Sequence, residues 1–285
     1  MTFVFAGVFI VLVTIYVITK RPTHEGNWRV DLKQLPTITF EGSQTTIHNL
    51  RCTRYGPPGT PLTASYTTRT YNLEEVTRVW FVQESFSAWR AVAHTLVSFE
   101  FADGQCLAVS IEARVTVGER YSLIRGVFNN FELMYVIGDE PDLIGRRAYY
   151  QQHDVYLYPL TLPAEDAQTL LRVMLEEAND LLGKPKFYNT LSYSCTSHLF
   201  RLFNRARQGL IPWRFGTIVP GYSDQMLVDQ GLIDSDKDSL HKVFYISDIV
   251  QDIITTNSDA SADTAFSQTI RKQLPRENLA KASSG

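Results

Sequence analysis

Two segments that alternate apolar and polar residues around a turn limit most strongly what this chain can fold into. Residues 93–101 (AHTLVSFEF) and 106–114 (CLAVSIEAR) flank Ala-Asp-Gly-Gln, a composition typical of a β-hairpin loop. Because successive side chains of a strand point to opposite faces, only an odd loop, such as residues 103–105, brings both apolar sets onto one face. The predicted register opposes residues whose numbers add to 208, so Phe99 faces Val109.

The other face of this hairpin carries a histidine and a carboxylate. In the predicted register Glu112 lies opposite Leu96 and diagonal to His94, within reach of a long side chain. A histidine with a carboxylate neighbour is the arrangement of a general base and the group that orients it. The alternatives are a half-buried histidine satisfied by the fold and a solvated glutamate. His94 and Glu112 are therefore candidate catalytic residues.

A lone cysteine lies where a polar, turn-prone segment enters an amphipathic helix. After Cys195, apolar residues recur at helical spacing, namely Leu199, Phe200, Leu202 and Phe203. Cys195 therefore falls in the first helical turn, with Ser194 or Ser192 as the N-cap. The free N–H groups and the helix dipole there favour a thiolate and a neighbouring oxyanion. The alternative is a small buried core residue.

The cysteine count and the charge narrow the chemistry. The three cysteines, Cys52, Cys106 and Cys195, either include a Cys52–Cys106 disulfide or are all reduced. A metal hydrolase built on His94, Glu112 and His198 lacks any HExxH-like spacing, so we expect no metal site and no cofactor. The net charge of −3 gives no reason to expect a nucleic-acid partner.

The chain divides into four predicted parts. Residues 2–19 form an uncharged run just long enough to cross a bilayer and lack a small-x-small cleavage site, which predicts a transmembrane anchor. A linker over 20–36 leads into one α+β domain over 37–255, and a polar, mobile tail follows over 256–285. The basic residues Lys20, Arg21 and Arg29 would by themselves favour a cytoplasmic domain.

The remaining pattern mixes strands and helices. Residues 161–182 read as a helix that begins near Pro163 and ends at Gly183, and residues 142–150 also look helical. Pro159 argues for an edge position or a strand end. The further strand-like segments are 37–40, 45–54, 69–71 and 154–160, and residues 127–137 form a hydrophobic element.

Several blocks of the chain resemble, in order, those of the Lnb-type N-terminal periplasmic domain family. They are NWRVDL, TIHNLRCTRY, AHTLVSFEFADGQCLAVSIEAR, FELMYVIGDEPDLI, DVYLYPL, FYNTLSYSCT and GYSDQMLVDQGLID, spread over residues 27–254. The resemblance implies an α+β fold of the circularly permuted papain/NlpC type, with an antiparallel sheet and a cysteine at a helix N-terminus. By the same resemblance His94 and Cys195 are the catalytic pair and Glu112 is the third residue. Ser194 departs from the asparagine expected in many relatives.

The resemblance also implies a function and a location. The implied reaction is acyl transfer through a thioester on Cys195, from a membrane phospholipid to the N-terminal amine of a bacterial apolipoprotein. It places the catalytic domain on the periplasmic side of the inner membrane, against the count of basic residues beside the anchor. Tyr188 and Asn189, in the cysteine block, are the candidate substrate-binding residues.

Two other functions remain open at this point. One is a periplasmic cysteine amidase or peptidase that acts on cell-wall peptides, since permuted papain-type folds serve both chemistries. The other is a non-catalytic envelope binding domain, in which Cys195 would be buried, slow to alkylate and without a histidine partner.

Overall fold

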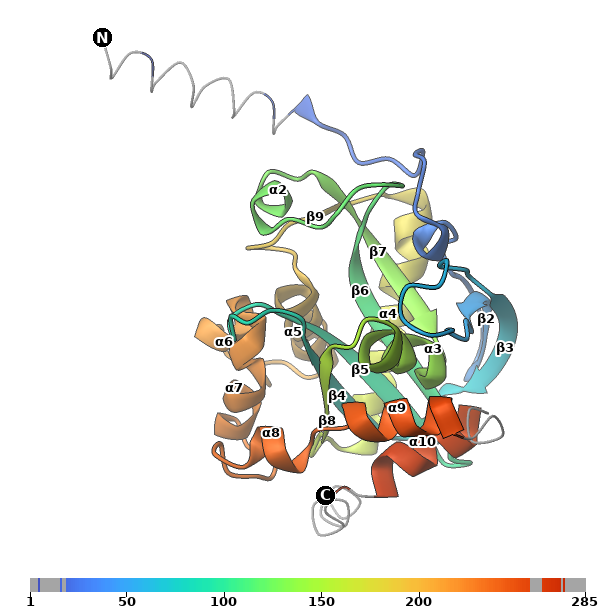
Figure 1. Ribbon diagram of the computed structural model, residues 1–285, viewed down its shortest axis with the longest axis vertical. Helices are drawn as coiled ribbons and strands as arrows, with labels where there is room; N and C mark the ends of the chain where they lie inside the picture. The colour runs from blue at the N-terminus through green and yellow to red at the C-terminus, as the bar shows by residue number, and fades with distance from the viewer. Residues whose placement is uncertain (1–4, 6–15, 17–18, 257–262, 273, 275–285) are drawn as a thin grey trace.

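The computed structural model describes residues 5, 16, 19–256, 263–272 and 274, and it has an α+β architecture built on one nine-stranded sheet (Figure 1). The strands are β1 Thr37–Glu41, β2 Gln44–Arg51, β3 Tyr66–Asn72, β4 Val76–Ser85, β5 Ala93–Phe101, β6 Cys106–Arg114, β7 Phe131–Gly138, β8 Asp154–Pro159 and β9 Phe187–Tyr188. The helices are α2 Leu123–Val127, α3 Glu140–Gly145, α4 Ala164–Gly183, α5 Cys195–Ala206, α6 Phe215–Ile218, α7 Ser223–Asp229, α8 Leu240–Val243, α9 Ser247–Thr256 and α10 Asp263–Lys272. Short helical turns are η1 Val30–Leu32, η2 Leu73–Glu75, the π-helical η3 Arg146–Tyr150 and η4 Pro220–Tyr222.

The sheet is mixed, although most of its pairs are antiparallel as predicted. Its order is β1-β2-β7-β6-β5-β4-β8, with β3 added to β2 and β9 added to β7. The parallel pair is β2 with β7, joined at Arg51 and Gly138. β8 is at the end of this path, where Pro159 leaves no ladder hydrogen bond unmade. The predicted edge position of this proline is confirmed.

The β5–β6 hairpin forms as predicted, but its register differs by two residues. Phe99 pairs with Leu107 and Val97 with Val109, so paired numbers add to 206 instead of 208. Phe101 N donates to Gln105 O, which closes a three-residue loop, and Gly104 supplies its left-handed residue at φ +83°. A shift of two keeps each side chain on its predicted face. It also moves Glu112 from a diagonal position to the position opposite His94, since 94 and 112 add to 206.

Helices cover both faces of the sheet, so its strands are buried on both sides. On one face α4 and α5 pack against the central strands, where Phe81 of β4 stacks on Phe200 of α5. On the other face lie α3, α9 and α10 (Figure 1), and there the Arg271 guanidinium sits 4.5 Å from the Trp80 ring centroid. The core is therefore two apolar layers around one sheet.

Both ends of the chain lie partly outside the described residues. No helix among the described residues is both long and apolar enough to span a bilayer, and the predicted anchor, residues 2–19, lies almost entirely outside them. The predicted mobile tail, residues 256–285, contains α10, whose Phe266 and Ile270 are fully buried. This helix packs on the domain, and its Arg271 forms a buried ion pair with Glu140 of α3.

Candidate active site

Cys195 is the first residue of α5, as the spacing of the apolar residues predicted. The Ser194 hydroxyl accepts a hydrogen bond from Ser197 N at 3.2 Å, and the Ser197 hydroxyl accepts one from Ser194 N at 3.0 Å. This reciprocal pair identifies Ser194, and not Ser192, as the N-cap. Asparagine, the residue expected here in many relatives, is an equally good cap.

The Cys195 side chain lies on the wall of a cavity of about 430 Å³. Only 3% of the residue is exposed, so the thiol is reached through the cavity rather than from the open surface. One part of the lining is apolar and includes Val92, Val115, Leu123, Leu191, Ile218 and Val219. The other part is charged and includes Arg29, Glu84, His94, Glu112, Arg146, Arg147 and His153. The cavity is thus amphipathic, with the cysteine among its lining residues.

His94 is oriented by Ser110, which stands between it and Glu112. The Ser110 hydroxyl donates to Glu112 Oε1 at 2.7 Å and lies 2.8 Å from His94 Nε2. Because the hydroxyl proton is committed to the carboxylate, Ser110 must accept from a protonated Nε2. Nδ1 is then the ring nitrogen left for the thiol. Glu112 Oε1 also lies 3.5 Å from Nε2, so the predicted histidine–carboxylate pair is present.

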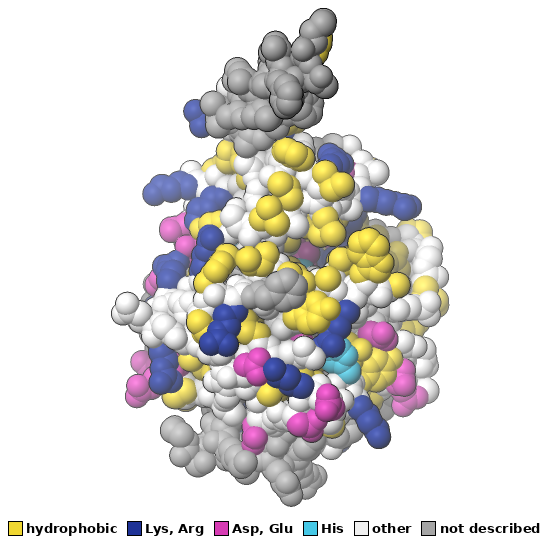
Figure 2. Space-filling model, turned by 90° about the vertical axis from the view of Figure 1, so that its left-hand side faces the viewer, with side chains coloured by type: hydrophobic (Ala, Val, Ile, Leu, Met, Phe, Trp, Pro, Cys, Tyr) yellow, Lys and Arg dark blue, Asp and Glu magenta, His cyan; other side chains and the backbone are white. Residues whose placement is uncertain are grey.

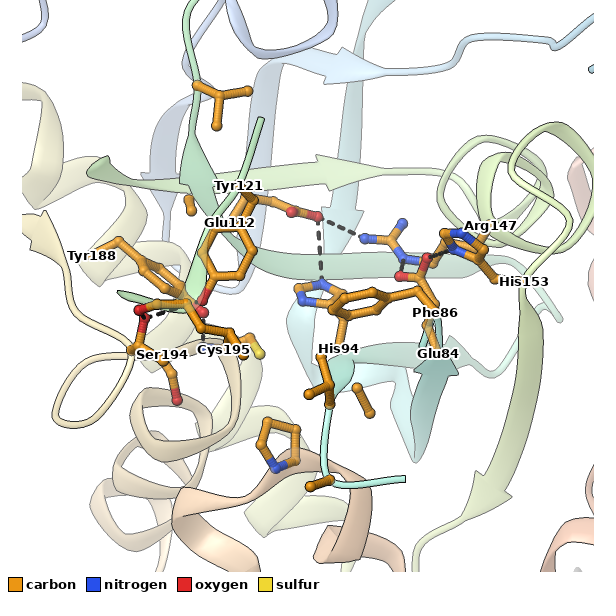
Figure 3. Close-up of a pocket in the computed structure, with 18 of the residues that line it drawn as sticks. Glu84, Phe86, His94, Glu112, Tyr121, Arg147, His153, Tyr188, Ser194 and Cys195 are labelled. Carbon is orange, nitrogen blue, oxygen red and sulfur yellow. Dashed lines mark hydrogen bonds and ion pairs between the residues drawn. The ribbon is translucent and has the colours of Figure 1, made fainter. Parts of the chain in front are cut away.

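A buried arginine continues this chain of charges away from the cysteine. Arg147 Nη2 donates to Glu112 Oε1 at 2.6 Å, and its Nε donates to Glu84 Oε2 at 2.8 Å. Glu84 Oε1 in turn lies 2.6 Å from His153 Nδ1 at the far side of the cavity (Figure 3). Arg147 thereby offsets two carboxylates that are otherwise buried side by side.

The charges around Cys195 favour a thiolate–imidazolium pair. Burial opposes ionisation of the thiol, but the charge of His94 and a hydrogen bond to it lower the pKa of Cys195 to about 7. Burial likewise opposes the imidazolium, yet Glu112 and Cys195 raise the pKa of His94 to about 10. The pKa of Glu112 is held well below its ordinary value, because His94 and Arg147 outweigh its burial. The carboxylate is therefore ionised throughout the range in which the pair operates.

The two predicted substrate-binding residues have different positions. The Tyr188 ring lines the cavity, and its hydroxyl oxygen accepts from Cys195 N at 3.4 Å (Figure 3). Asn189 is not among the lining residues. Its amide instead donates to Val127 O and Asn129 Oδ1, and its oxygen accepts from the backbone of the cysteine loop. For Asn189 the structure thus gives a role in holding this loop, in place of contact with a substrate.

The residues of the alternative metal site do not come together. The His198 side chain is 2% exposed, its Nε2 lies 2.8 Å from the Tyr135 hydroxyl, and it is absent from the cavity lining that holds His94 and Glu112. Among the described residues, no group of three histidine, cysteine, aspartate or glutamate side chains could hold a metal ion. Cys52, Cys106 and Cys195 are all free thiols, which is the second of the two predicted possibilities.

Two residues of the site, Ser110 and Arg147, were missed in the sequence. Ser110 carries a usable signal, because it precedes Glu112 by two positions and so shares its strand face. Arg147 carries none, because the predicted helix over 142–150 does not show that its π-helical part, η3, turns this side chain toward Glu84 and Glu112.

Comparison with known proteins agrees with the resemblance of the sequence blocks. A family model described as the Lnb N-terminal periplasmic domain matches residues 63–219, more than half of the 285-residue chain, and this range contains His94, Glu112 and Cys195. No curated protein and no solved structure matched the chain significantly. The family description assigns such domains to the periplasm. This chain belongs to the Lnb N-terminal periplasmic domain family.

Proposed function

We propose that this protein is a cysteine-dependent acyltransferase that carries an acyl group as a thioester on Cys195. The observation that carries the proposal is the position of Cys195 at the start of α5, coupled to His94 inside a cavity with an apolar wall. A thiolate at a helix N-terminus with an imidazolium partner is an activated nucleophile.

The reaction proceeds in two halves. Nδ1 of His94 takes the thiol proton, and the Cys195 thiolate attacks the carbonyl carbon of an ester. The ester C–O bond breaks, the leaving alkoxide receives the proton from His94, and a thioester remains on the sulfur. An amine then attacks the thioester and gives up a proton to His94, the C–S bond breaks, and the thiolate is restored. Glu112 stabilises the imidazolium in both halves.

Tyr188 is the proposed oxyanion donor beside the Cys195 N–H. Burial raises the pKa of this tyrosine well above its ordinary value, so its hydroxyl keeps its proton at all pH values of interest. A neutral hydroxyl 3.4 Å from the Cys195 backbone nitrogen can donate to the tetrahedral oxyanion as negative charge develops there.

A phospholipid donor and a lipoprotein acceptor fit the cavity and the family. The apolar wall suits an acyl chain, and the family is named for a periplasmic domain of Lnb-type proteins. We propose the N-terminal amine of bacterial apolipoproteins as the acceptor. Residues 2–19 would tether the domain to the periplasmic side of the inner membrane as a single-pass anchor. This chemistry uses the protein's own side chains and needs no cofactor.

The proposed fold relationship is to the circularly permuted papain/NlpC enzymes. It is supported by the order of the site along the chain, with His94 on β5 ahead of Cys195 at the start of α5. The same relationship keeps a cell-wall amidase or peptidase as the second function. The apolar share of the cavity wall favours the lipid substrate over a polar peptide.

The test is an assay that measures both an N-acylated lipopeptide and a cleaved cell-wall peptide as products, each from its own substrate. Full-length protein would be incubated with phospholipid vesicles and a synthetic lipopeptide that begins with a free cysteine amine, and peptide masses would be followed. We expect an N-acylated peptide with wild type and none with Cys195→Ala. Cleavage of a cell-wall peptide without N-acylation would instead support the amidase.

A further inference from the structure

The exposed large hydrophobic residues of this protein gather at one place. From residue 19 onward, nine such side chains are exposed in the described chain, and six of them either line the Cys195 cavity, as Phe86, Leu123 and Leu191 do, or lie within five residues of one of these three. Those six are Phe86, Trp89, Leu123, Ile124, Phe128 and Leu191. Figure 2 shows hydrophobic side chains collected over the upper half of one face, with lysine and arginine along its margins. A patch at the mouth of a cavity indicates an interaction surface.

Two segments form one side of this mouth, which we call the α2 lip and define as Leu123, Ile124, Phe128 and Leu191. The Thr190 hydroxyl donates to Leu123 O at 2.9 Å, and Thr190 N donates to Gly126 O at 3.4 Å. A Cβ on Gly126 would lie 2.1 Å from the Thr190 hydroxyl, so glycine is required for this close approach. The α2 lip is therefore a single unit, within which Ile124 is 72% exposed.

The opposite side, the loop lip, consists of Phe86 and Trp89 between β4 and β5. Trp89 is 75% exposed, and Phe86 lies 6.0 Å from His153, centroid to centroid. The backbone of Gly221 packs so closely against this loop that a Cβ on Gly221 would lie 1.5 Å from Arg90 O. The cavity thus opens between two apolar lips that the fold keeps in place.

The uncharged N-terminal run joins the domain beside the α2 lip. Lys20 Nζ donates to Asn130 Oδ1 at 2.7 Å and to Asn129 O at 3.3 Å, immediately after α2. Residues 2–19, which contain no charge, therefore leave the domain at the same end as the lip. If residues 2–19 are inserted in a bilayer, the α2 lip lies at the surface of that bilayer, with Lys20 and Arg21 at the depth of the lipid headgroups.

We propose that the two lips dock on a phospholipid bilayer and insert into its interface, so that the cavity opens toward the lipid. The inference builds on the proposed function and names the surface through which its donor enters. Exposed tryptophan, phenylalanine and leucine beside cationic residues are the side chains that interfacial binding uses. An acyl chain then passes between the lips along Val92 and Ile218 to Cys195.

Insertion depth can be measured without any catalysis. Full-length Cys195→Ala protein would be placed in phosphatidylcholine–phosphatidylglycerol nanodiscs, with Trp89→Phe and Trp213→Phe leaving only the buried Trp28 and Trp80. A new tryptophan is then introduced by Ile124→Trp, by Leu191→Trp or, as the matched exposed control on another segment, by Lys237→Trp. Dibrominated phosphatidylcholine should quench the first two strongly and the control weakly. Equal, weak quenching at all three sites would overturn the proposal and point to a protein partner for the lips.

A second measurement separates docking from chemistry. The double variant Ile124→Glu, Trp89→Glu changes one residue of each lip that does not line the cavity. It should lose most acyl transfer from vesicle phospholipid and keep its rate with a water-soluble short-chain ester, whereas Lys237→Glu keeps both. Retained transfer from vesicles, or equal loss with both esters, would contradict the role of the lips. If wild type transfers neither ester while the quenching pattern holds, the proposed function fails and the membrane surface stands.

Discussion

At the scale of single residues, the site depends on a contest between burial and charge at Cys195. Burial alone would raise the pKa of the thiol, and it is His94, kept protonated by Glu112, that reverses the direction. The ion pair forms as the pH rises through the pKa of Cys195, about 7, and is lost as the pH rises through that of His94, about 10. The reactive window therefore includes neutral pH.

The pH dependence of Cys195 alkylation tests this electrostatic account. The rate with iodoacetamide should rise with an apparent pKa of about 7 in wild type. In Glu112→Gln the midpoint should move upward, toward the ordinary thiol value of about 8.5, because the imidazolium loses its counter-charge. Cys52, a partly exposed free thiol that would also alkylate, is removed in both proteins by Cys52→Ala. An identical midpoint in the two proteins would contradict the role of Glu112.

Ser110 should act on His94 through its tautomer. Ser110→Ala removes the acceptor that keeps His94 Nε2 protonated. Losing the free energy of about one hydrogen bond, which orients the imidazole, predicts a roughly tenfold lower kcat. Ser110→Thr keeps the hydroxyl and should restore most of the rate. The imidazole Nε2 proton signal in NMR should be displaced in the alanine variant and near its wild-type position in the threonine variant. Unchanged kcat and NMR signal in Ser110→Ala would refute this role.

At the scale of elements, the geometry of the site depends on the N-cap of α5 and on the π-helical turn η3. Ser194 ends the cysteine loop and starts α5, while η3 directs Arg147 between Glu84 and Glu112. Both fix charged or polar groups to within hydrogen-bond distance of the site.

Removing the cap should cost stability in a predictable amount. Ser194→Ala leaves the Ser197 N–H without its acceptor and should lower the free energy of unfolding by about 1 kcal/mol. Ser194→Asn should restore it, since asparagine caps as well as serine. Denaturant titration of the three proteins measures the difference, and an alanine variant as stable as wild type would show that this cap contributes nothing.

Arg147 should be far more costly to remove than a surface arginine. Arg147→Met leaves Glu84 and Glu112 buried without their shared cation, which costs about 3–5 kcal/mol. Arg207, whose side chain is 55% exposed in its pair with Asp166, is the matched control, and Arg207→Met should cost about 0–1 kcal/mol. Equal costs from urea titration would contradict the buried network.

The apolar repeats of two residues in strands and 3.6 residues in helices predicted the secondary-structure elements well, but they predicted the pairing register of the strands poorly. The faces of the β5–β6 hairpin were predicted correctly, because alternation fixes which side chains share a face. Alternation cannot distinguish registers that differ by two residues, so the pairing of Phe99 with Leu107 instead of Val109 was not predicted. Helix α4 was predicted almost to its ends, as Pro163 and Gly183 mark them. The position of Cys195 at a helix N-terminus and of His94 beside Glu112 was likewise predicted, whereas Arg147 depends on a tertiary contact that leaves no local pattern.

At the scale of the whole molecule, α10 closes the second face of the sheet although its sequence is mostly polar. Phe266 and Ile270 supply its apolar contacts, and Arg271 reaches Glu140 and the Trp80 ring. Two apolar side chains and a buried arginine are too weak a pattern to predict a helix, which explains why the segment read as a mobile tail.

The contribution of α10 can be measured with one core variant and one surface variant. Phe266→Ala opens a cavity against the sheet and should lower the free energy of unfolding by about 3–5 kcal/mol. Gln268, exposed on the same helix, is the control, and Gln268→Ala should be nearly neutral. If neither variant changes the stability in a thermal melt, α10 contributes nothing to the fold, as expected for a mobile tail.

Mass spectrometry of the protein itself can show whether Cys195 carries an acyl group. Full-length protein would be incubated with phospholipid, digested, and its Cys195 peptide compared before and after hydroxylamine. An acyl-sized, hydroxylamine-labile mass is expected on that peptide in wild type and in Cys52→Ala, and none is expected in Cys195→Ala. Acyl transfer to an amine that continues in Cys195→Ala would contradict this role of Cys195.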